Sequence, residues 1–240
     1  MGKLLAAFIF IVSLSLPPSI TAAEVQWIDL SVAGGDSVRA AFSSYDPEEP
    51  SVTDPTRNWR QRKECGGGIQ YDYACYAVDA CGYFAGEVPI RVFAAGSESE
   101  KYDIVNRLYG IIEYPNGCIG IVESSRKADF TQELQITCAQ GILNLPMAWT
   151  IYEETDIKHL HSAGWAKLLT DTYSLSKADA YQLQLENFAD VIRGKARPSM
   201  PLIHSVVNTF TLEALVRSLR EKRTVEIEIP DLVARTFKEY

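Results

Sequence analysis

The chain has 240 residues, and 47% of them are hydrophobic, so it is long enough to bury one substantial core. Its 31 acidic residues outnumber its 23 Lys and Arg residues, which gives a formal net charge of −8 at pH 7. Since no basic stripe interrupts this acidic balance, nucleic acid and anionic membranes are excluded as expected partners.

Residues 1–23 differ in composition from the rest of the chain. Lys3 precedes an apolar run from Leu4 to Leu16, and small residues then lead to the polar Glu24. This pattern is typical of a secretory signal peptide, and the apolar run is too short to span a membrane. An authentic leader predicts a secreted or periplasmic protein with no membrane span after its removal. The alternative is a truncated gene model, in which case the protein is cytoplasmic.

The cysteines favour the second alternative. Five are present, an odd number without paired metal-ligand spacings: Cys65, Cys75, Cys81, Cys118 and Cys138. Such scattered use is typical of reduced, buried thiols in a cytosol rather than of a secreted disulfide framework. The two signals disagree, and the sequence leaves the localisation open.

In chain order, the first predicted element is a strand over residues 24–33, where β-favouring side chains dominate. Gly, Ser, Pro and acidic residues then predict a long loop over residues 34–57. The three glycines at 66–68 form a turn, and the apolar and aromatic run after them predicts a helix up to Phe84.

Six short strands are predicted after this helix: residues 88–95, 105–114, 118–124, 134–138, 142–145 and 147–152. Pro115-Asn116-Gly117 separates the second from the third, and an Asn-Gly step between apolar runs is a strong hairpin signal. Gly141 and Pro146 separate the last three. Together these segments predict a mostly antiparallel meander.

From Ser176 the apolar period lengthens to that of a helix. Two successive helical faces are expected, the first with Tyr181, Leu185, Phe188 and Ile192, the second with Ile203, Val207, Phe210 and Ala214. Residues 225–229 alternate like a closing strand. Helices before and after a run of strands predict an α+β fold, an open, mainly antiparallel sheet with helices packed on one face. No Pro- and Ser-rich linker divides the chain, so residues 24–240 are expected to form one domain.

Asp72 and Tyr76 are the candidate site residues. They lie at i and i+4 after the glycine turn, so both side chains are expected on one face of the first helical turns. Exposed N–H groups at a helix N-terminus favour an anion or a polar ligand group, and glycines let it approach the backbone. The alternative is structural, an Asp that complements the helix dipole and a Tyr that packs with its hydroxyl hydrogen-bonded.

Several short motifs occur, once each, within residues 24–229: Asn58-Trp59-Arg60, Gly66-Gly67-Gly68, Asp72-x-x-x-Tyr76, Tyr83-Phe84-x-Gly86-x-x-Pro89, Tyr114-Pro115-Asn116-Gly117, Phe188-x-x-x-Ile192-Arg193-Gly194-x-x-x-Pro198 and Glu213-Ala214. Together they resemble the C-terminal domain of the Gfo/Idh/MocA oxidoreductases. Many members carry His where this chain has Tyr76. The chain is similar to the Tyr-type branch of glucose-fructose oxidoreductase, xylose dehydrogenase and dihydrodiol dehydrogenase.

The resemblance implies an NAD(P)-dependent oxidoreductase of sugars or polyols, in which a nicotinamide cofactor takes the hydride. It implies Tyr76 as the acid/base group or its hydrogen-bond partner, and Asp72 as the group that orients a substrate hydroxyl or Tyr76. Trp59 and Arg60 are candidates for substrate binding, although an Arg beside a Trp is as often a structural cation–π pair. A phenol needs a neighbouring cation to act as a base at neutral pH, and the family's lysine would supply it.

The sequence contains no match to two parts of that family. The turn at 66–68 lacks the third glycine of a dinucleotide fingerprint and follows a charged segment instead of an apolar strand. The family's Glu-Lys-Pro lysine has no counterpart. The chain thus resembles the substrate-binding and oligomerisation half alone, and NAD or NADP is implied by the family only. The alternative function is a non-catalytic carbohydrate-binding or assembly module derived from that family.

The three histidines give a weak signal. His159 and His161 alternate without a nearby Cys or carboxylate in a metal-ligand spacing, so surface histidines and no metal site are expected. His204 is expected to cap or pack a helix. Three acidic residues are expected to be solvated: Asp171, Asp179 and Glu186.

Apolar residues occupy both alternating positions of the meander: Val105, Leu108, Ile111, Ile112, Ile119, Ile121, Leu134 and Ile136. This is more than one helix-covered face requires, and a sheet whose second face is apolar must bury that face. A homodimer with two-fold symmetry, formed by face-to-face sheet packing, is therefore expected. The alternative is that the extra residues fill corner positions within one subunit.

Overall fold

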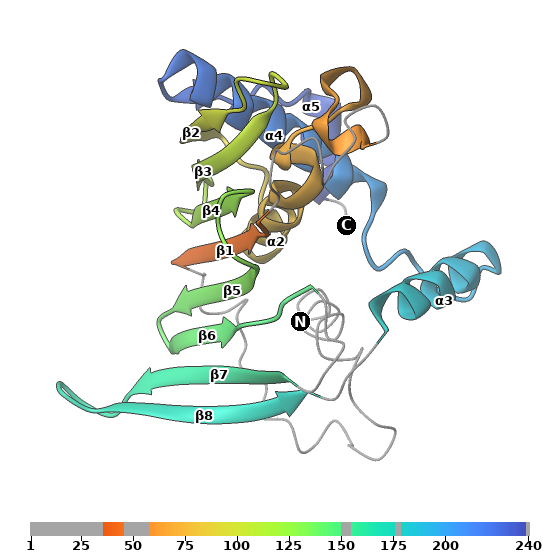
Figure 1. The fold of residues 1–240 in the computed structure, drawn as a ribbon. Helices are drawn as coiled ribbons and strands as arrows, with labels where there is room; N and C mark the ends of the chain where they lie inside the picture. The colour runs from red at the N-terminus through yellow and green to blue at the C-terminus, as the bar shows by residue number, and fades with distance from the viewer. Residues whose placement is uncertain (1–35, 46–57, 150–154, 176–178, 239–240) are drawn as a thin grey trace.

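A computed structural model of the chain describes residues 36–45, 58–149, 155–175 and 179–238. Within these ranges one open sheet has nine strands in the spatial order β8-β7-β6-β5-β1-β4-β3-β2-β9 (Figure 1). The strands are β1 (Ser37–Ser43), β2 (Arg91–Glu98), β3 (Val105–Glu113), β4 (Ile119–Ser125), β5 (Thr131–Cys138), β6 (Gly141–Leu145), β7 (Thr155–Ser162), β8 (Leu168–Leu175) and β9 (Val225–Glu226). Apart from the parallel pair of β1 and β4, the pairings among these strands are antiparallel.

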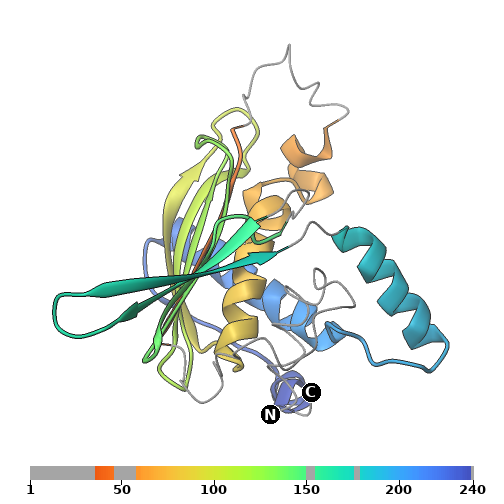
Figure 2. The same ribbon diagram turned by 90° about the horizontal axis from the view of Figure 1, so that it is seen from below.

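Two of the helices cover one face of this sheet. The described helices are α2 (Cys75–Ala85), α3 (Ala180–Ile192), α4 (Leu202–Glu221) and α5 (Asp231–Lys238). In both views α2 and α4 lie side by side against the strands (Figures 1 and 2). Glycines permit this close packing, because a Cβ at Gly110 would lie 2.6 Å from Cδ2 of Leu215 and a Cβ at Gly120 would lie 3.1 Å from Cβ of Cys81. The predicted α+β class is confirmed.

The centre of the sheet is the main correction to the predicted elements. β1 lies inside the segment predicted to be a loop, and Val38 and Ala40 are fully buried. Two alanines lower the strand propensity of this segment, so pairing with β4 and β5 on its two sides, rather than propensity, determines its conformation. The predicted strand at 24–33 and the predicted signal peptide at 1–23 lie outside the described residues.

Other predicted boundaries hold in part. The hairpin between β3 and β4 is confirmed, with Gly117 at φ 87° and the Tyr114 N–H donating to the carbonyl of Cys118 at 3.1 Å. The strand predicted at 147–152 is wrong over its described residues, where Met147 makes an isolated bridge to Gln132. The closing strand is shorter than predicted and is followed by α5, which the sequence did not predict.

The predicted helix α3 exists but lies apart from the sheet (Figure 1). Asp179 is exposed, as predicted, and it also caps this helix, because its carboxylate accepts from the N–H groups of Tyr181 and Gln182 at 3.0 and 3.1 Å. None of its residues is buried.

Across the described ranges, none of the helices combines the length and the apolar content needed to cross a bilayer.

Candidate functional site

The three glycines before α2 shape the backbone rather than an anion site. The N–H groups of Gly66, Gly67 and Gly68 donate to the carbonyls of Lys63, Arg62 and Arg60 at 3.1, 2.8 and 3.0 Å. A Cβ at Gly67 would lie 2.7 Å from the Arg62 carbonyl oxygen, so the turn has no room for a side chain there. The N–H groups of the three glycines are therefore engaged within the turn and are not available to a ligand.

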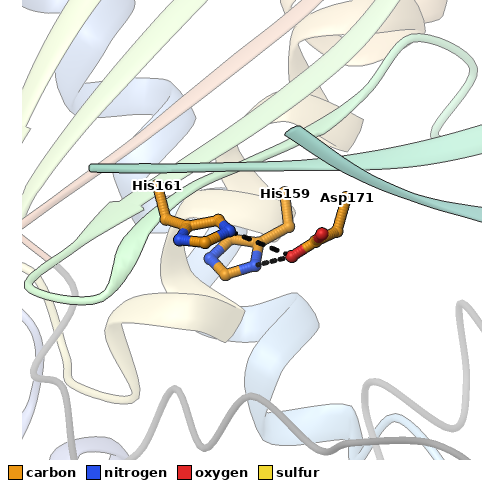
Figure 3. Close-up of side chains that lie close together, drawn as sticks. All are labelled: His159, His161 and Asp171. Carbon is orange, nitrogen blue, oxygen red and sulfur yellow. Dashed lines mark hydrogen bonds and ion pairs between the residues drawn. The ribbon is translucent and has the colours of Figure 1, made fainter. Parts of the chain in front are cut away.

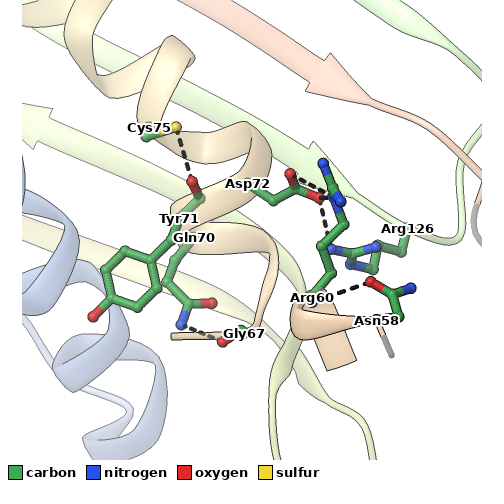
Figure 4. A network of polar contacts seen from close by, with 8 residues as sticks. All are labelled: Asn58, Arg60, Gly67, Gln70, Tyr71, Asp72, Cys75 and Arg126. Atoms are coloured by element: carbon green, nitrogen blue, oxygen red, sulfur yellow. Dashed lines mark hydrogen bonds and ion pairs between the residues drawn. The ribbon is translucent and has the colours of Figure 1, made fainter. Parts of the chain in front are cut away.

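After the turn, the chain enters one π-helical turn, Gln70–Ala74, before α2 begins. Asp72 lies in this wider turn, and two arginines are its partners (Figure 4). Both carboxylate oxygens lie 3.0 Å from Nε of Arg60, and Oδ2 also accepts from a terminal guanidinium nitrogen of Arg126 at 2.8 Å. The side chains of Asp72 and Arg126 are only 7% and 2% exposed.

This ion-pair cluster connects three distant segments and also involves the predicted substrate residues. The guanidinium carbon of Arg60 lies 4.8 Å from the ring centre of Trp59, so the two side chains form a cation–π pair. The guanidinium of Arg126 lies 5.5 Å from the ring centre of Tyr73. Two arginines donate to Asp72, so both of its carboxylate oxygens are engaged in ion pairs.

Tyr76 lies on an aromatic surface built around Phe42 of β1. The Phe42 ring stacks on Tyr73 and Trp149 at centroid distances of 4.8 and 5.5 Å. Tyr76 meets the edges of Phe42 and Trp149 at 5.2 and 6.2 Å. Since Tyr76 is 42% exposed, its ring presents a flat apolar area with a polar hydroxyl to the solvent.

The protonation of Tyr76 follows from its surroundings. Partial burial raises the pKa of this phenol above its ordinary value, and the neighbouring Cys75 and Tyr181 raise it further. Arg60 lowers the pKa, but its effect is the smaller one. At neutral pH the hydroxyl therefore keeps its proton and can donate a hydrogen bond.

Sequence reasoning missed Phe42, Tyr73, Arg126 and Trp149. Phe42 lies in the segment predicted to be a loop, and Trp149 in a segment predicted to be a strand. Phe130, which is exposed, also approaches Phe42, with ring centroids 6.5 Å apart. Contacts between residues so far apart in sequence depend on the fold.

The remaining predicted side chains lie elsewhere. His204 packs against Phe237 with ring centroids 4.4 Å apart, as predicted for a packing residue. Exposed Glu186 accepts from Gln182 at 2.7 Å. All five cysteines are free, and Cys81, Cys118 and Cys138 are buried, as expected for reduced thiols. His159 and His161 meet Asp171 on the β7–β8 hairpin, far from Tyr76 in sequence and on other elements.

Comparison with known proteins supports the resemblance. Residues 36–144 match the model of the GFO/IDH/MocA C-terminal domain. The chain is 28% identical over 165 residues to D-xylose 1-dehydrogenase (NADP(+)) 2 of Haloferax volcanii, covering 69% of this chain and 50% of that protein. It is 24% identical over 170 residues to myo-inositol 2-dehydrogenase of Thermotoga maritima, covering 68% and 50%. The chain thus spans about half the length of the curated relatives it matches.

Solved structures show the same fold. An aldose-aldose oxidoreductase from Caulobacter crescentus, complexed with glycerol, superposes with a TM-score of 0.67 at 18% identity, covering 80% of this chain and 56% of that one. A levoglucosan dehydrogenase in complex with NADH gives 0.67 at 17% identity, covering 81% and 59%. The predicted resemblance to the C-terminal domain of the Gfo/Idh/MocA oxidoreductases is confirmed.

Proposed function

Because this chain carries a Gfo/Idh/MocA C-terminal domain over residues 36–144, we propose that it is the substrate-binding and oligomerisation half of an NAD(P)-dependent sugar or polyol oxidoreductase. The observation that carries the proposal is the placement of Tyr76, an exposed phenol on an aromatic surface beside the buried Asp72–Arg126 pair. Stacked aromatic rings bind the apolar face of a sugar, and a phenol binds a hydroxyl or carbonyl oxygen.

In this proposal Tyr76 is the acid. Its raised pKa keeps the phenol protonated, so it donates a hydrogen bond, and in the reducing direction a proton, to the substrate oxygen. Asp72 positions the first turn of the site through Arg60 and Arg126. To act as a base in the oxidising direction, Tyr76 needs a cation close to its oxygen, which a second half of the enzyme would supply.

NAD or NADP would also be held by that second half. The glycine turn of this chain does not fit a dinucleotide, because the three glycine N–H groups already donate to backbone carbonyls. Such a cofactor supplies hydride acceptance when it is bound. The relatives are about twice as long as the matched segment, which is consistent with a separate cofactor-binding half.

We place the surface for this second half on α3. Its apolar side chains Tyr181, Leu185, Phe188 and Ile192 are between 61% and 71% exposed. Tyr181, at the start of this stripe, also raises the pKa of the Tyr76 phenol, so the stripe and the proposed site interact electrostatically. An apolar stripe of this kind needs a partner, and a domain that closes over Tyr76 would cover it.

Sugar binding by the purified chain tests the proposal. Titration with D-xylose, myo-inositol and related sugars should change the fluorescence of Trp149, which lies 6.2 Å from Tyr76. Replacement of Tyr76 by Phe removes one hydrogen bond, so affinity should fall by roughly tenfold, corresponding to about 1.4 kcal/mol. Tyr109→Phe is the matched control, because Tyr109 is also 42% exposed but lies on β3. Equal affinities of the two variants would contradict the assignment.

Hydride transfer distinguishes the second candidate function, the non-catalytic carbohydrate-binding or assembly module. With a cofactor-binding half added in trans or by fusion, an enzyme half should oxidise a bound sugar, and Tyr76→Phe should slow turnover. Sugar binding without any turnover in that assay would favour the module. Unchanged turnover of Tyr76→Phe on every accepted sugar would remove Tyr76 from the chemistry.

We also propose a homodimer through the uncovered face of the sheet. Five of the eight apolar residues used for that prediction belong to the core, whereas Ile111 is 45% exposed and Ile119 and Ile121 are partly buried. Phe93 (43% exposed) pairs with Ile111 across β2 and β3, and Tyr109 lies on the same face. These side chains form one apolar area beside the ion pairs of Arg39 with Glu123 and Glu133.

Sedimentation equilibrium tests this assembly. The chain should be dimeric at micromolar concentration, and Ile111→Asp should make it monomeric because a charge would enter the apolar area. Leu185→Asp on α3 is the control, and it should leave the dimer intact. A monomeric parent chain at high micromolar concentration would end the proposal.

A further inference from the structure

The β7–β8 hairpin brings three metal-ligating side chains together (Figure 3). His159 of β7 is the direct cross-strand partner of Asp171 of β8, and His161 lies two residues further along the same face. Oδ2 of Asp171 lies 3.0 Å from Nε2 of His161 and 3.7 Å from Nδ1 of His159. One ligand atom from each of the three residues lies within 4.8 Å of the others.

A backbone carbonyl determines the tautomer of His159. Its Nε2 lies 3.2 Å from the carbonyl oxygen of Gln140. A carbonyl oxygen accepts but does not donate, so Nε2 carries the hydrogen in the neutral ring and Nδ1 carries the lone pair. This arrangement, a ring N–H bound to a carbonyl and the other nitrogen free, is the one that orients histidine ligands in metal sites.

The lone pair of Nδ1 therefore faces a carboxylate oxygen. In the neutral ring these two acceptors lie 3.7 Å apart, a separation that a cation between them would bridge. Two ligands of one tetrahedral zinc ion are separated by about 3.3–3.6 Å, given bond lengths of about 2.0–2.2 Å. The separations of 3.0 and 3.7 Å from Oδ2 lie on either side of this range, so small rotations of the side chains would admit the ion.

Packing holds the two imidazoles in place. Their rings stack with centroids 4.8 Å apart and an interplanar angle of 20°. Gly141 makes room for them, since a Cβ there would lie 3.0 Å from Nε2 of His159 and 3.1 Å from Cβ of His161. Ile157, fully packed at 2% exposed, occupies the preceding position on this face of β7. Asp171 is 55% exposed in its side chain, so an ion can enter from the solvent.

We propose that His159, His161 and Asp171 bind one divalent transition-metal ion, with zinc as the probe. Two imidazole nitrogens and one carboxylate favour Zn²⁺, Ni²⁺ or Cu²⁺ over Mg²⁺ and Ca²⁺, which prefer ligand sets made of oxygen. Three protein ligands leave a fourth position for water or an added ligand. The ion would link β7 to β8 in the part of the sheet that the helices cover least.

Histidine NMR of the full chain, without a polyhistidine tag, tests the proposal directly. The chain has 3 histidines, so each ring can be followed. One equivalent of Zn²⁺ should shift Nδ1 of His159 and Nε2 of His161 and leave the signals of His204 unchanged. Shifts of all three rings in proportion to zinc, or of none, would overturn the site.

Competition with a chromogenic chelator measures the affinity. Asp171→Asn and His161→Ala should each weaken zinc binding at least tenfold. Asp156→Asn is the matched control, because Asp156 lies on the same hairpin and accepts from Ser174 at 2.8 Å without facing the histidines. Cys65→Ser tests the exposed thiol as a competing ligand and should have no effect. Equal zinc affinity in Asp171→Asn and Asp156→Asn would refute the proposal.

Discussion

Two regions of this molecule have the same amphipathic sequence pattern, but their apolar side chains are buried in one region and exposed in the other. In the covered region, β1 to β5 pack under α2 and α4, and Leu215 of α4 is fully buried. In the uncovered region, the β7–β8 hairpin extends past the rest of the sheet and α3 lies apart from it (Figure 2). Leu185 of α3 is 67% exposed although it lies on the predicted apolar face of its helix.

The difference shows that periodicity predicts the type of an element but not its burial. Burial depends on whether another apolar face lies opposite. The same distinction applies to charges. Asp72 pairs with Arg126 inside the covered region, and Asp171 pairs with His161 on the exposed hairpin. The two regions therefore predict different costs for the same substitution.

The largest expected effect is on the buried ion pair. Asp72→Asn leaves the charge of Arg126 buried without its carboxylate, which should lower the free energy of unfolding by about 3–5 kcal/mol. Asp171→Asn, measured in EDTA so that metal does not contribute, should cost less than about 1 kcal/mol because its ion pair is exposed. Urea unfolding of both variants checks this. Similar losses of unfolding free energy in the two variants would contradict the burial of the Asp72–Arg126 pair that the structure shows.

The next-largest expected effect is the loss of stability when a leucine is replaced by alanine in each region. Leu215→Ala leaves a cavity in the core and should cost about 2–5 kcal/mol. Leu185→Ala removes the same atoms from an exposed surface and should change stability by less than about 0.5 kcal/mol. Chemical denaturation of the isolated chain gives both numbers. A large cost for Leu185→Ala would show that the stripe on α3 is already buried in solution, by association with another copy.

Much of the fold follows from local sequence signals. Pro115-Asn116-Gly117 predicts the β3–β4 hairpin because its turn chemistry is local, and the periodicity through Phe188 predicts α3 for the same reason. β1 could not be predicted in this way. Its alanines favour no strand, and its conformation depends on β4 and β5, which lie about 80 to 100 residues later in the chain.

The site was predictable only where a motif identified it. Tyr76 and Asp72 were found through their resemblance to a family, whereas Arg126 was missed because it lies 54 residues from Asp72 in sequence. Asp171 was missed as a partner of His159 and His161 because the hairpin register that pairs them has no local signature. Long-range pairing determines both clusters.

The smallest expected effect is a pH dependence at Asp79, a carboxylate of the covered region that accepts from Asn208. Burial raises the pKa of Asp79 from 3.8 to about 6, and the hydrogen bond from Asn208 opposes that rise. The folded state therefore holds a proton that the unfolded state releases between about pH 4 and 6. The protonated carboxyl therefore makes its full contribution to the free energy of unfolding below pH 3.8, and this contribution is lost as the pH rises to about 6.

Asp79→Asn isolates this contribution, because the amide cannot ionise. Between pH 4.5 and 7 the free energy of unfolding of the variant should rise by about 2 kcal/mol relative to that of the parent chain. Each unit of pKa shift corresponds to about 1.4 kcal/mol, and part of the stabilisation is already lost at pH 4.5. Urea unfolding at both pH values measures the change. Asp156→Asn on the exposed hairpin is the control and should track the parent at both values. The contrary outcome is that the stabilities of the parent chain and of Asp79→Asn change in parallel between the two pH values. The carboxyl would then already be charged in the folded protein at pH 4.5, and burial between α2 and α4 would not control its ionisation.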